Sequence, residues 1–306
     1  MIKMINYPWI NHHSIQVCLI IVSFIITTGC TIPDQRDTAP QWNLSPDGNI
    51  SFTVPKILVQ EQVIVQNENL RITNLTFKGF FGDVHALQIS PKIPVAFLVW
   101  APGANNPAAG YLEYMKYYPE HNIGVLIIDV RGNGGITPGY PMDIERDAEL
   151  FLQGEWPQLY LIAIDLISAE QYVMDHYPSV PVYAVGDSNG GRYAALAAGS
   201  ENSFAGYIGI SMSGFNCMGD QYKSPLREFL LSIDPEFLIP RINTRPVLLF
   251  HAPGDPIIPF EDGHALADAA GNNSKFIPFN GTHGVNREVD DKIIAFLHGS
   301  YTGVEG

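Results

Sequence analysis

Three residues in the second half of the 306-residue chain have side chains that suit nucleophilic catalysis. Ser188 lies in the stretch "GDSNGG", and Asp255 and His283 follow it along the chain. A serine hydroxyl is a poor nucleophile until a neighbouring base takes its proton, and that base needs a carboxylate to hold its tautomer. The order serine, acid, histidine therefore makes these residues a candidate catalytic triad for acyl transfer.

Ser188 occurs where a strand pattern gives way to a helix pattern. "VPVYAVG" precedes the serine and "GGRYAALAAG" follows it, so we expect a sharp turn that lifts the hydroxyl clear of the backbone. Gly186 and Gly190 would form this elbow, because glycine removes the Cβ atoms that would clash in so tight a turn. A chain with 28 glycines also produces such a pattern by chance, which leaves an ordinary strand-to-helix turn as the alternative.

The elements that must position these residues alternate between strands and helices. Continuous apolar runs of strand length predict buried strands, and the longer periodic pattern at 157–177 predicts a helix. The first three stretches alternate and predict antiparallel strands. The fold class is therefore α/β, with a mostly parallel, mixed central sheet flanked by helices on both faces. The strands are expected within 56–66, 70–79, 83–90, 93–103, 123–135, 180–186, 204–214, 245–255 and 275–284.

Asp255 and His283 both come just after a predicted strand, as Ser188 does. The carboxyl ends of parallel strands meet at one rim of a sheet, so the three residues are expected at the same rim. Two segments, 136–156 and 215–244, break the alternation of strands and helices. We expect them to form a small cap or insertions over a pocket at that rim, where ligands bind in open α/β sheets.

Several short motifs together resemble the α/β-hydrolase family over roughly residues 60–300, in particular serine esterases and dienelactone-hydrolase-like enzymes. The motifs are "GDSNGG", "HAPGDPIIP", "NGTHG", "WAPGANN" and "DVRGNGG". The resemblance implies that Ser188 is the nucleophile, His283 the general base and acid, and Asp255 the orienting carboxylate. It also implies hydrolysis of a carboxylic ester in a small-molecule substrate through an acyl-enzyme, with no cofactor.

The resemblance further implies an oxyanion hole made by the backbone N–H groups of Ala104 and Asn189. Many members of the family carry His-Gly after the first buried strand, whereas this chain has Pro102-Gly103. Backbone donors tolerate such a change of side chain. The missing "HGGG" argues against the hormone-sensitive-lipase type, although Asp187 precedes the serine as it does there.

Other assignments of the acid and of the function remain open at this stage. Asp220 and Glu228 follow the fourth predicted buried strand, where some family members place the acid. A small peptidase or amidase of the same fold is an alternative function. A non-catalytic binding protein at the cell surface is another, although it has no need of a serine, an acid and a histidine.

Charge and cysteine content limit the range of partners. The net charge of −14 argues against nucleic-acid binding, which requires dense lysine and arginine. The spacing of the cysteines and histidines matches no metal-binding pattern, so we expect no metal site and interpret Cys217 as a buried thiol. Asp129 and Arg131 are expected to form a structural pair in a turn. No pattern indicates an oligomeric state.

The N-terminus has the pattern of an export signal. Residues 1–29 contain Lys3, then an uncharged apolar run and small residues before Cys30, and the run is shorter than the roughly 20 residues of a spanning helix. "TTGC" resembles a bacterial lipobox, which implies lipidation of Cys30 and a membrane lipoprotein facing the periplasm or the cell surface. Ordinary secretion and an uncleaved anchor are the alternatives. Residues 30–55 would form a tether, and 56–306 one hydrolase domain.

Overall fold

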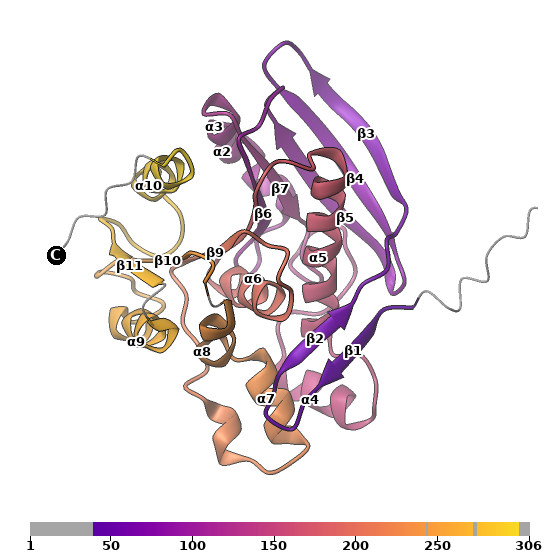
Figure 1. The fold of residues 1–306 in the computed structure, drawn as a ribbon, viewed down its shortest axis with the longest axis vertical. Helices are drawn as coiled ribbons and strands as arrows, with labels where there is room; N and C mark the ends of the chain where they lie inside the picture. The colour runs from indigo at the N-terminus through magenta and orange to yellow at the C-terminus, as the bar shows by residue number, and fades with distance from the viewer. Residues whose placement is uncertain (1–38, 243, 272–273, 300–306) are drawn as a thin grey trace, which may run out of the picture. The chain divides into compact units, whose positions relative to one another are not determined.

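The computed structural model describes residues 39–242, 244–271 and 274–299. Within these ranges nine strands form one sheet in the order β11-β10-β9-β8-β6-β7-β5-β4-β3 (Figure 1). The strands are β3 (Val59–Gln66), β4 (Arg71–Gly79), β5 (Gly82–Ser90), β6 (Ala96–Ala101), β7 (Ile123–Ile128), β8 (Val182–Asp187), β9 (Gly206–Ile210), β10 (Val247–His251) and β11 (Ser274–Pro278).

The sheet is mixed, as the sequence predicts. Strands β6 to β11 run parallel to one another, and β3, β4 and β5 are joined antiparallel at the β7 side. The side chains of β6 and β7 are buried along their whole length, because helices cover both faces of the parallel part. The predicted fold class is confirmed.

Helices pack on the two faces of the sheet and create two hydrophobic cores. One core includes residues of α5, α6, α7, α8 and α9, and the other includes residues of α2, α3 and α10. The helices are α2 (Leu112–Met115), α3 (Tyr117–Glu120), α4 (Ile144–Leu152), α5 (Gln158–His176), α6 (Asn189–Ser200), α7 (Leu226–Ile233), α8 (Pro235–Leu238), α9 (Phe260–Ala270) and α10 (Arg287–Leu297), with 3-10 turns at η2 (Ala108–Tyr111), η3 (Met218–Gln221) and η4 (Ile239–Ile242). Among these described helices, none combines the length and apolar character that a membrane crossing requires.

A β-hairpin occupies residues that the sequence assigns to a tether. β1 (Gln41–Leu44) and β2 (Ile50–Thr53) pair antiparallel, and Ile50 and Phe52 are buried in the same core as α5. The ring of Trp42 lies 5.7 Å from that of Tyr160 on α5. The tether prediction is therefore corrected for this part of the chain. The predicted signal segment and Cys30 lie outside the described residues.

The two predicted insertions fold as short helices. The first contains α4, and the second contains η3, α7, α8 and η4. Helices α4 and α7 contact each other, and the rings of Phe151 and Phe229 stack with centroids 5.0 Å apart.

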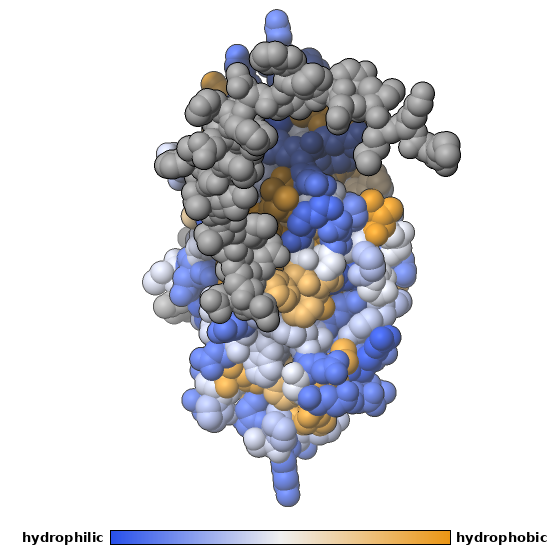
Figure 2. All heavy atoms as spheres, turned by 90° about the vertical axis from the view of Figure 1, so that its right-hand side faces the viewer, coloured by the Kyte–Doolittle hydropathy of each residue, from blue (hydrophilic) through white to orange (hydrophobic). Residues whose placement is uncertain are grey.

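Strand β3 forms one edge of the nine-stranded sheet, and most of its residues are exposed. On the face seen in Figure 2, hydrophobic residues form small patches among hydrophilic ones.

Glu170 is a glutamate on the buried face of α5. Its side chain is fully buried, Oε2 accepts a hydrogen bond of 2.6 Å from Ser203 Oγ, and Oε1 has no partner. Burial raises the pKa of Glu170 to about 7, and the Ser203 hydrogen bond offsets only part of this effect. The native state therefore binds the Glu170 proton more tightly than the unfolded chain does.

Glu170→Gln is expected to flatten the pH dependence of stability. As pH rises from the ordinary glutamate value of 4.5 toward about 7, the wild type loses the stability that the neutral group provides. The free energy of unfolding of the wild type, measured with urea, should fall relative to that of the variant by on the order of 2 kcal/mol across this window. Glu149→Gln, at an exposed position of α4, should keep the wild-type dependence. Parallel curves for the wild type and Glu170→Gln would contradict the prediction.

Candidate active site

Ser188 sits between β8 and α6 in a backbone conformation that L-residues rarely adopt. Its φ is 53° and its ψ −126°, and its backbone N–H donates to the carbonyl of Ile210 at 2.9 Å. The side chain is partly exposed at the rim where the parallel strands end. A strained, non-glycine residue held by strand and helix on either side is typical of functional positions.

The two glycines around Ser188 are required by close backbone contacts. A Cβ on Gly190 would lie 1.9 Å from the carbonyl oxygen of Ala101, at the end of β6. A Cβ on Gly186 would lie 2.3 Å from the carbonyl carbon of Gly190. Real Cβ atoms do not approach backbone so closely. The glycine spacing therefore follows from the packing of this strand-to-helix turn.

The structure brings Asp255 and His283 together. Asp255 lies in the turn after β10, and His283 lies in the loop between β11 and α10. The Nδ1 atom of His283 is 2.8 Å from Oδ2 and 3.1 Å from Oδ1 of Asp255. The carboxylate is fully buried, whereas the imidazole keeps 22% of its side-chain surface exposed. An imidazole held in this way has Nδ1 directed at the acid and leaves Nε2 available to another group.

The pKa of Asp255 lies below the ordinary value of an aspartate. Burial alone raises the pKa of this carboxyl, but the backbone N–H groups of Ile258 and Ile257 and the side chain of His283 favour the charged form more strongly. The N–H groups of Ile257 and Ile258 donate to Oδ1 at 2.8 and 3.0 Å. The buried His251 contacts the same carboxylate, with Nε2 3.6 Å from Oδ2. Asp255 is thus a fixed, ionised partner for His283.

Ser188 and His283 occupy the same rim but are not hydrogen-bonded to each other. Within the described residues the Ser188 hydroxyl has no hydrogen-bond partner. Catalytic hydrogen bonds are often long before a substrate binds. One further contact anchors the histidine loop near the serine side: the N–H of Gly284 donates to Ser211 Oγ, after β9, at 3.0 Å.

The expected oxyanion donors lie on the two segments that meet at Ser188. A Cβ built on Gly103 would lie 3.3 Å from the Cβ of Ser188, so the loop that carries Ala104 runs directly past the nucleophile turn. Asn189 is the first residue of α6, where a helix leaves its N–H groups unpaired. The backbone N–H of Ala104 donates to no described residue. Neither N–H group therefore has a described hydrogen-bond acceptor.

Asp187 ties the nucleophile turn to the loop after β6. Its buried carboxylate accepts hydrogen bonds from Trp100 Nε1 at 2.9 Å, from the Gly103 N–H at 3.1 Å and from the Tyr111 hydroxyl at 2.8 Å. Burial raises the pKa of Asp187, and these donors and the charge of His283 oppose the rise. Sequence reasoning noted Asp187 only as the residue before the serine, and it missed the role of this carboxylate as the link to the oxyanion loop.

Asn133 is a second supporting residue that the sequence did not identify. Its side-chain amide donates to the carbonyls of Gly103 and Asn106 at 2.8 and 2.9 Å, and its carbonyl accepts from the Asn105 N–H at 2.8 Å. It lies in "DVRGNGG", so the motif contained the signal. The amide fixes the loop that carries Ala104 from the side of β7.

Asp129 and Arg131 have structural roles but do not pair with each other. Asp129 accepts hydrogen bonds from backbone N–H groups, including that of Thr137 at 2.8 Å. Arg131 forms a buried ion pair with Asp165 on α5 at 2.6 Å. The expected turn pair is therefore replaced by two separate anchors, one for the following loop and one for α5.

The rival acids do not reach His283. Asp220 pairs with Arg227 at 3.1 Å in the second insertion, and Glu228 lies on α7. The partner of His283 is Asp255. The structure thus joins two of the three predicted triad residues and places the third at the same rim.

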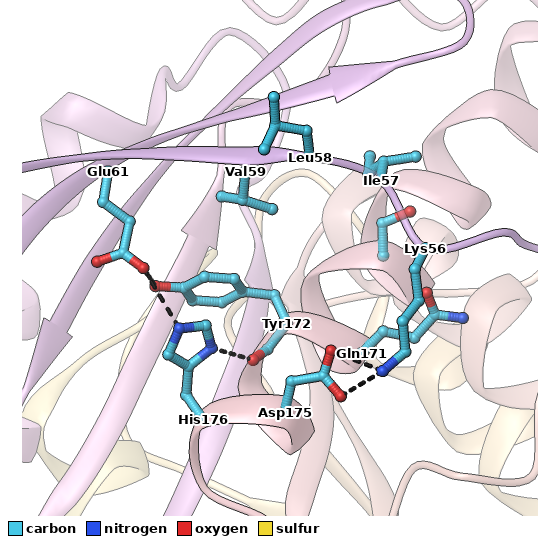
Figure 3. A pocket seen from close by; sticks show the side chains of 10 residues that line it. Lys56, Ile57, Leu58, Val59, Glu61, Gln171, Tyr172, Asp175 and His176 are labelled. Carbon is cyan, nitrogen blue, oxygen red and sulfur yellow. Dashed lines mark hydrogen bonds and ion pairs between the residues drawn. The ribbon is translucent and has the colours of Figure 1, made fainter. Parts of the chain in front are cut away.

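A cavity of about 270 Å³ lies away from this rim, between β3 and α5 (Figure 3). The charged side chains that line it are paired with other lining residues. Lys56 bonds to Asp175 at 2.6 Å, and Glu61 accepts from the Tyr172 hydroxyl at 2.9 Å and lies 3.3 Å from His176. Ser188, Asp255 and His283 are not among the residues that line it, so it is not the candidate catalytic cavity.

A larger hollow of about 580 Å³ is connected to the elbow through Arg192 on α6. Arg192 NH1 donates to the side chain of Asn189 at 2.8 Å, and its guanidinium lies over the ring of Phe215. Arg146 lies over the ring of Tyr140 across the hollow, 3.8 Å from the centroid. Residues of the predicted insertion at 136–156 thus line this hollow together with Arg192 and Phe215, whereas Ser188, Asp255 and His283 are not among its lining residues.

Comparisons with solved structures agree with this fold. The chain is similar to an acetyl xylan esterase from Paenibacillus sp. R4, at 18% identity, with 79% of this chain and 89% of that chain covered and a TM-score of 0.64. An acetyl xylan esterase from Thermoanaerobacterium sp. JW/SL YS485 matches at 19% identity, 81% and 89% coverage and a TM-score of 0.64. A glucuronoyl esterase from Solibacter usitatus matches at 13% identity, 82% and 87% coverage and a TM-score of 0.58.

At these identities the likeness establishes the fold, which is that of the α/β-hydrolases. No model of a known protein family matches the sequence. A search of curated proteins also finds no match. The activity must therefore be argued from the geometry of the rim.

Proposed function

We propose that the protein is a serine hydrolase that cleaves a carboxylic ester through an acyl-enzyme. The observation that carries the proposal is the buried Asp255 held against His283 Nδ1 at 2.8 Å, at the same rim as the strained Ser188. The imidazole of His283 keeps 22% of its side-chain surface exposed, so it can receive a proton at the rim. Esterase structures of the same fold support the reaction class.

The proposed mechanism gives each of these groups one role. Ser188 Oγ attacks the ester carbonyl carbon while His283 Nε2 takes the hydroxyl proton, and Asp255 stabilises the imidazolium that forms. The N–H groups of Ala104 and Asn189 donate to the oxyanion, and each such donor is typically worth about 2.7–4 kcal/mol in the transition state. His283 then protonates the leaving alcohol. It next takes a proton from water, which attacks the acyl-enzyme and releases the acid.

We infer that the hollow lined by Arg192 binds a polar, carbohydrate-like part of the substrate. Its lining combines the rings of Tyr140 and Phe215 with the guanidinium groups of Arg146 and Arg192. Aromatic faces with a few placed polar groups are typical of small-molecule sites. The titles of the similar esterases name acetylated xylan and glucuronoyl esters. We infer an acylated sugar as the substrate class, and an aminoacyl amide assayed in parallel tests the peptidase alternative.

Ser188→Ala should abolish both hydrolysis and labelling by a fluorophosphonate probe. Without the hydroxyl no acyl-enzyme forms, so kcat/KM for an acetyl ester should fall by at least about 10³-fold. Ser179→Ala, at an exposed serine, should label and turn over like the wild type. If the folded wild type is not labelled, the enzyme proposal fails.

Asp255→Asn should lower kcat by about 10³- to 10⁴-fold and change KM little. Asparagine cannot hold the tautomer of His283 or stabilise its charge, whereas substrate contacts are untouched. The matched control is Asp268→Asn, since Asp268 also faces a histidine, His264, at 3.2 Å but on the exposed surface of α9. Steady-state kinetics should show wild-type kcat for the control. An equal loss in both variants would contradict the assignment of Asp255.

We also propose that the protein is exported and anchored by lipid on Cys30, with residues 1–29 removed. The proposal rests on the "TTGC" pattern after an uncharged apolar run. Metabolic incorporation of a fatty-acid analogue should label the wild type and leave Cys30→Ala unlabelled. Cys18→Ala, within the removed segment, should be labelled as the wild type is. Labelling that persists in Cys30→Ala contradicts the anchor.

A further inference from the structure

Cys217, Asp234 and Glu236 converge in the second insertion, at a place that the proposed reaction does not use. The sulfur and one carboxylate oxygen of each acid all lie within 4.8 Å of one another. Cys217 is exposed, which corrects the expectation of a buried thiol. Residue spacing did not indicate this cluster, because the three residues come from two segments that meet only in the fold.

Backbone contacts hold the cluster in place. Cys217 lies in the loop after β9, and its N–H donates to Glu236 Oε2 at 2.9 Å. Asp234 caps α8: its Oδ1 accepts from the Glu236 N–H and from the Phe215 N–H, both at 3.1 Å. The loop and the start of α8 are therefore joined through the same groups that form the cluster.

The second oxygen of Asp234 has no partner. The Asp234 side chain is fully buried, and its Oδ2 neither reaches solvent nor accepts a hydrogen bond. An unpaired buried carboxylate oxygen is costly, because it has lost its hydration without replacement. The same carboxylate belongs to the cluster with Cys217 and Glu236, so a cation bound there would neutralise a buried carboxylate that is not fully hydrogen-bonded.

The neighbouring guanidinium of Arg192 does not donate a hydrogen bond to Asp234 Oδ2. Arg192 interacts electrostatically with both Asp234 and Glu236. Its hydrogen bonds, however, go to Ser213 and to Asn189. The guanidinium thus offsets part of the negative charge without satisfying Asp234 Oδ2.

We propose that Cys217, Asp234 and Glu236 bind one Zn²⁺ ion. Zinc is borderline-soft and accepts a thiolate together with carboxylate oxygens in a tetrahedral arrangement. On binding, the Cys217 thiol loses its proton to solvent and a zinc–sulfur bond forms. The exposed side of Cys217 leaves the fourth position open to water. This site goes beyond the proposed esterase function and does not depend on it.

The loop that would hold the zinc also supports the catalytic rim. Ser211 Oγ accepts a hydrogen bond from the N–H of Gly284, next to His283. Ser213 accepts two hydrogen bonds from the guanidinium of Arg192, which also donates to the side chain of Asn189. Zinc at Cys217 would fix the far end of this loop against α8. The expected role is therefore to order the rim.

Metal-stripped full-length protein, titrated with Zn²⁺ against a chromophoric chelator, should bind one equivalent. Cys217→Ala and Glu236→Gln should each weaken binding by at least about tenfold. Asp220→Asn is the matched control, because Asp220 acts on Cys217 through its charge but is not a member of the cluster. It should bind like the wild type. The other cysteines of the protein are left unchanged in every variant, so a loss in Cys217→Ala identifies the thiol.

Co²⁺ gives an independent readout of the ligand. The wild type and Asp220→Asn should develop a thiolate-to-cobalt charge-transfer absorption, and Cys217→Ala should not. Circular dichroism must show that each variant is folded, which matters most for Asp234→Asn because Asp234 caps α8. Absence of Zn²⁺ uptake by the folded wild type would overturn the proposal. Equal affinity in Cys217→Ala, Glu236→Gln and the wild type would do so as well.

Discussion

The candidate site depends on how closely the start of α6 approaches the end of β6. At Gly190 only a hydrogen atom fits beside the carbonyl of Ala101, and at Gly186 only a hydrogen atom fits beside Gly190. This contact lets the chain turn at Ser188 with a positive φ and directs the first N–H groups of α6 toward the rim. The buried strands and the helix hold the strained turn, since neither can move without opening the core.

Asp187 extends this constraint to the oxyanion loop. A buried carboxylate is tolerated only when hydrogen bonds replace its hydration, and here Trp100, Gly103 and Tyr111 donate those bonds from three separate positions. The position of Gly103 is therefore coupled to that of the nucleophile turn. Because this coupling acts through the backbone N–H of Gly103, Pro102-Gly103 holds the loop at the serine without help from a side chain at position 102.

The sequence predicted the sheet and the placement of Asp255 and His283 because both depend on local patterns. Apolar runs mark buried strands, and residues that follow parallel strands share a rim. The sequence did not predict the hairpin at 41–53, where strands of four residues carry too little alternation to stand out against proline and aspartate nearby. Nor did it predict the neighbours of Cys217. Helix α7 lies between Cys217 and Asp234 in the sequence, so Asp234 and Glu236 reach the thiol only once this helix has folded.

The loop after β9 connects the two halves of the proposed machinery. Ser211, itself at a positive φ of 49°, holds the N–H of Gly284 on the histidine side. Two residues later, Ser213 holds Arg192, whose other hydrogen bond positions Asn189 on the oxyanion side. A shift of this loop would therefore move base and oxyanion donor together. If the far end of this loop is held rigidly beside Cys217 and α8, the positions of His283 and Asn189 relative to Ser188 would be maintained.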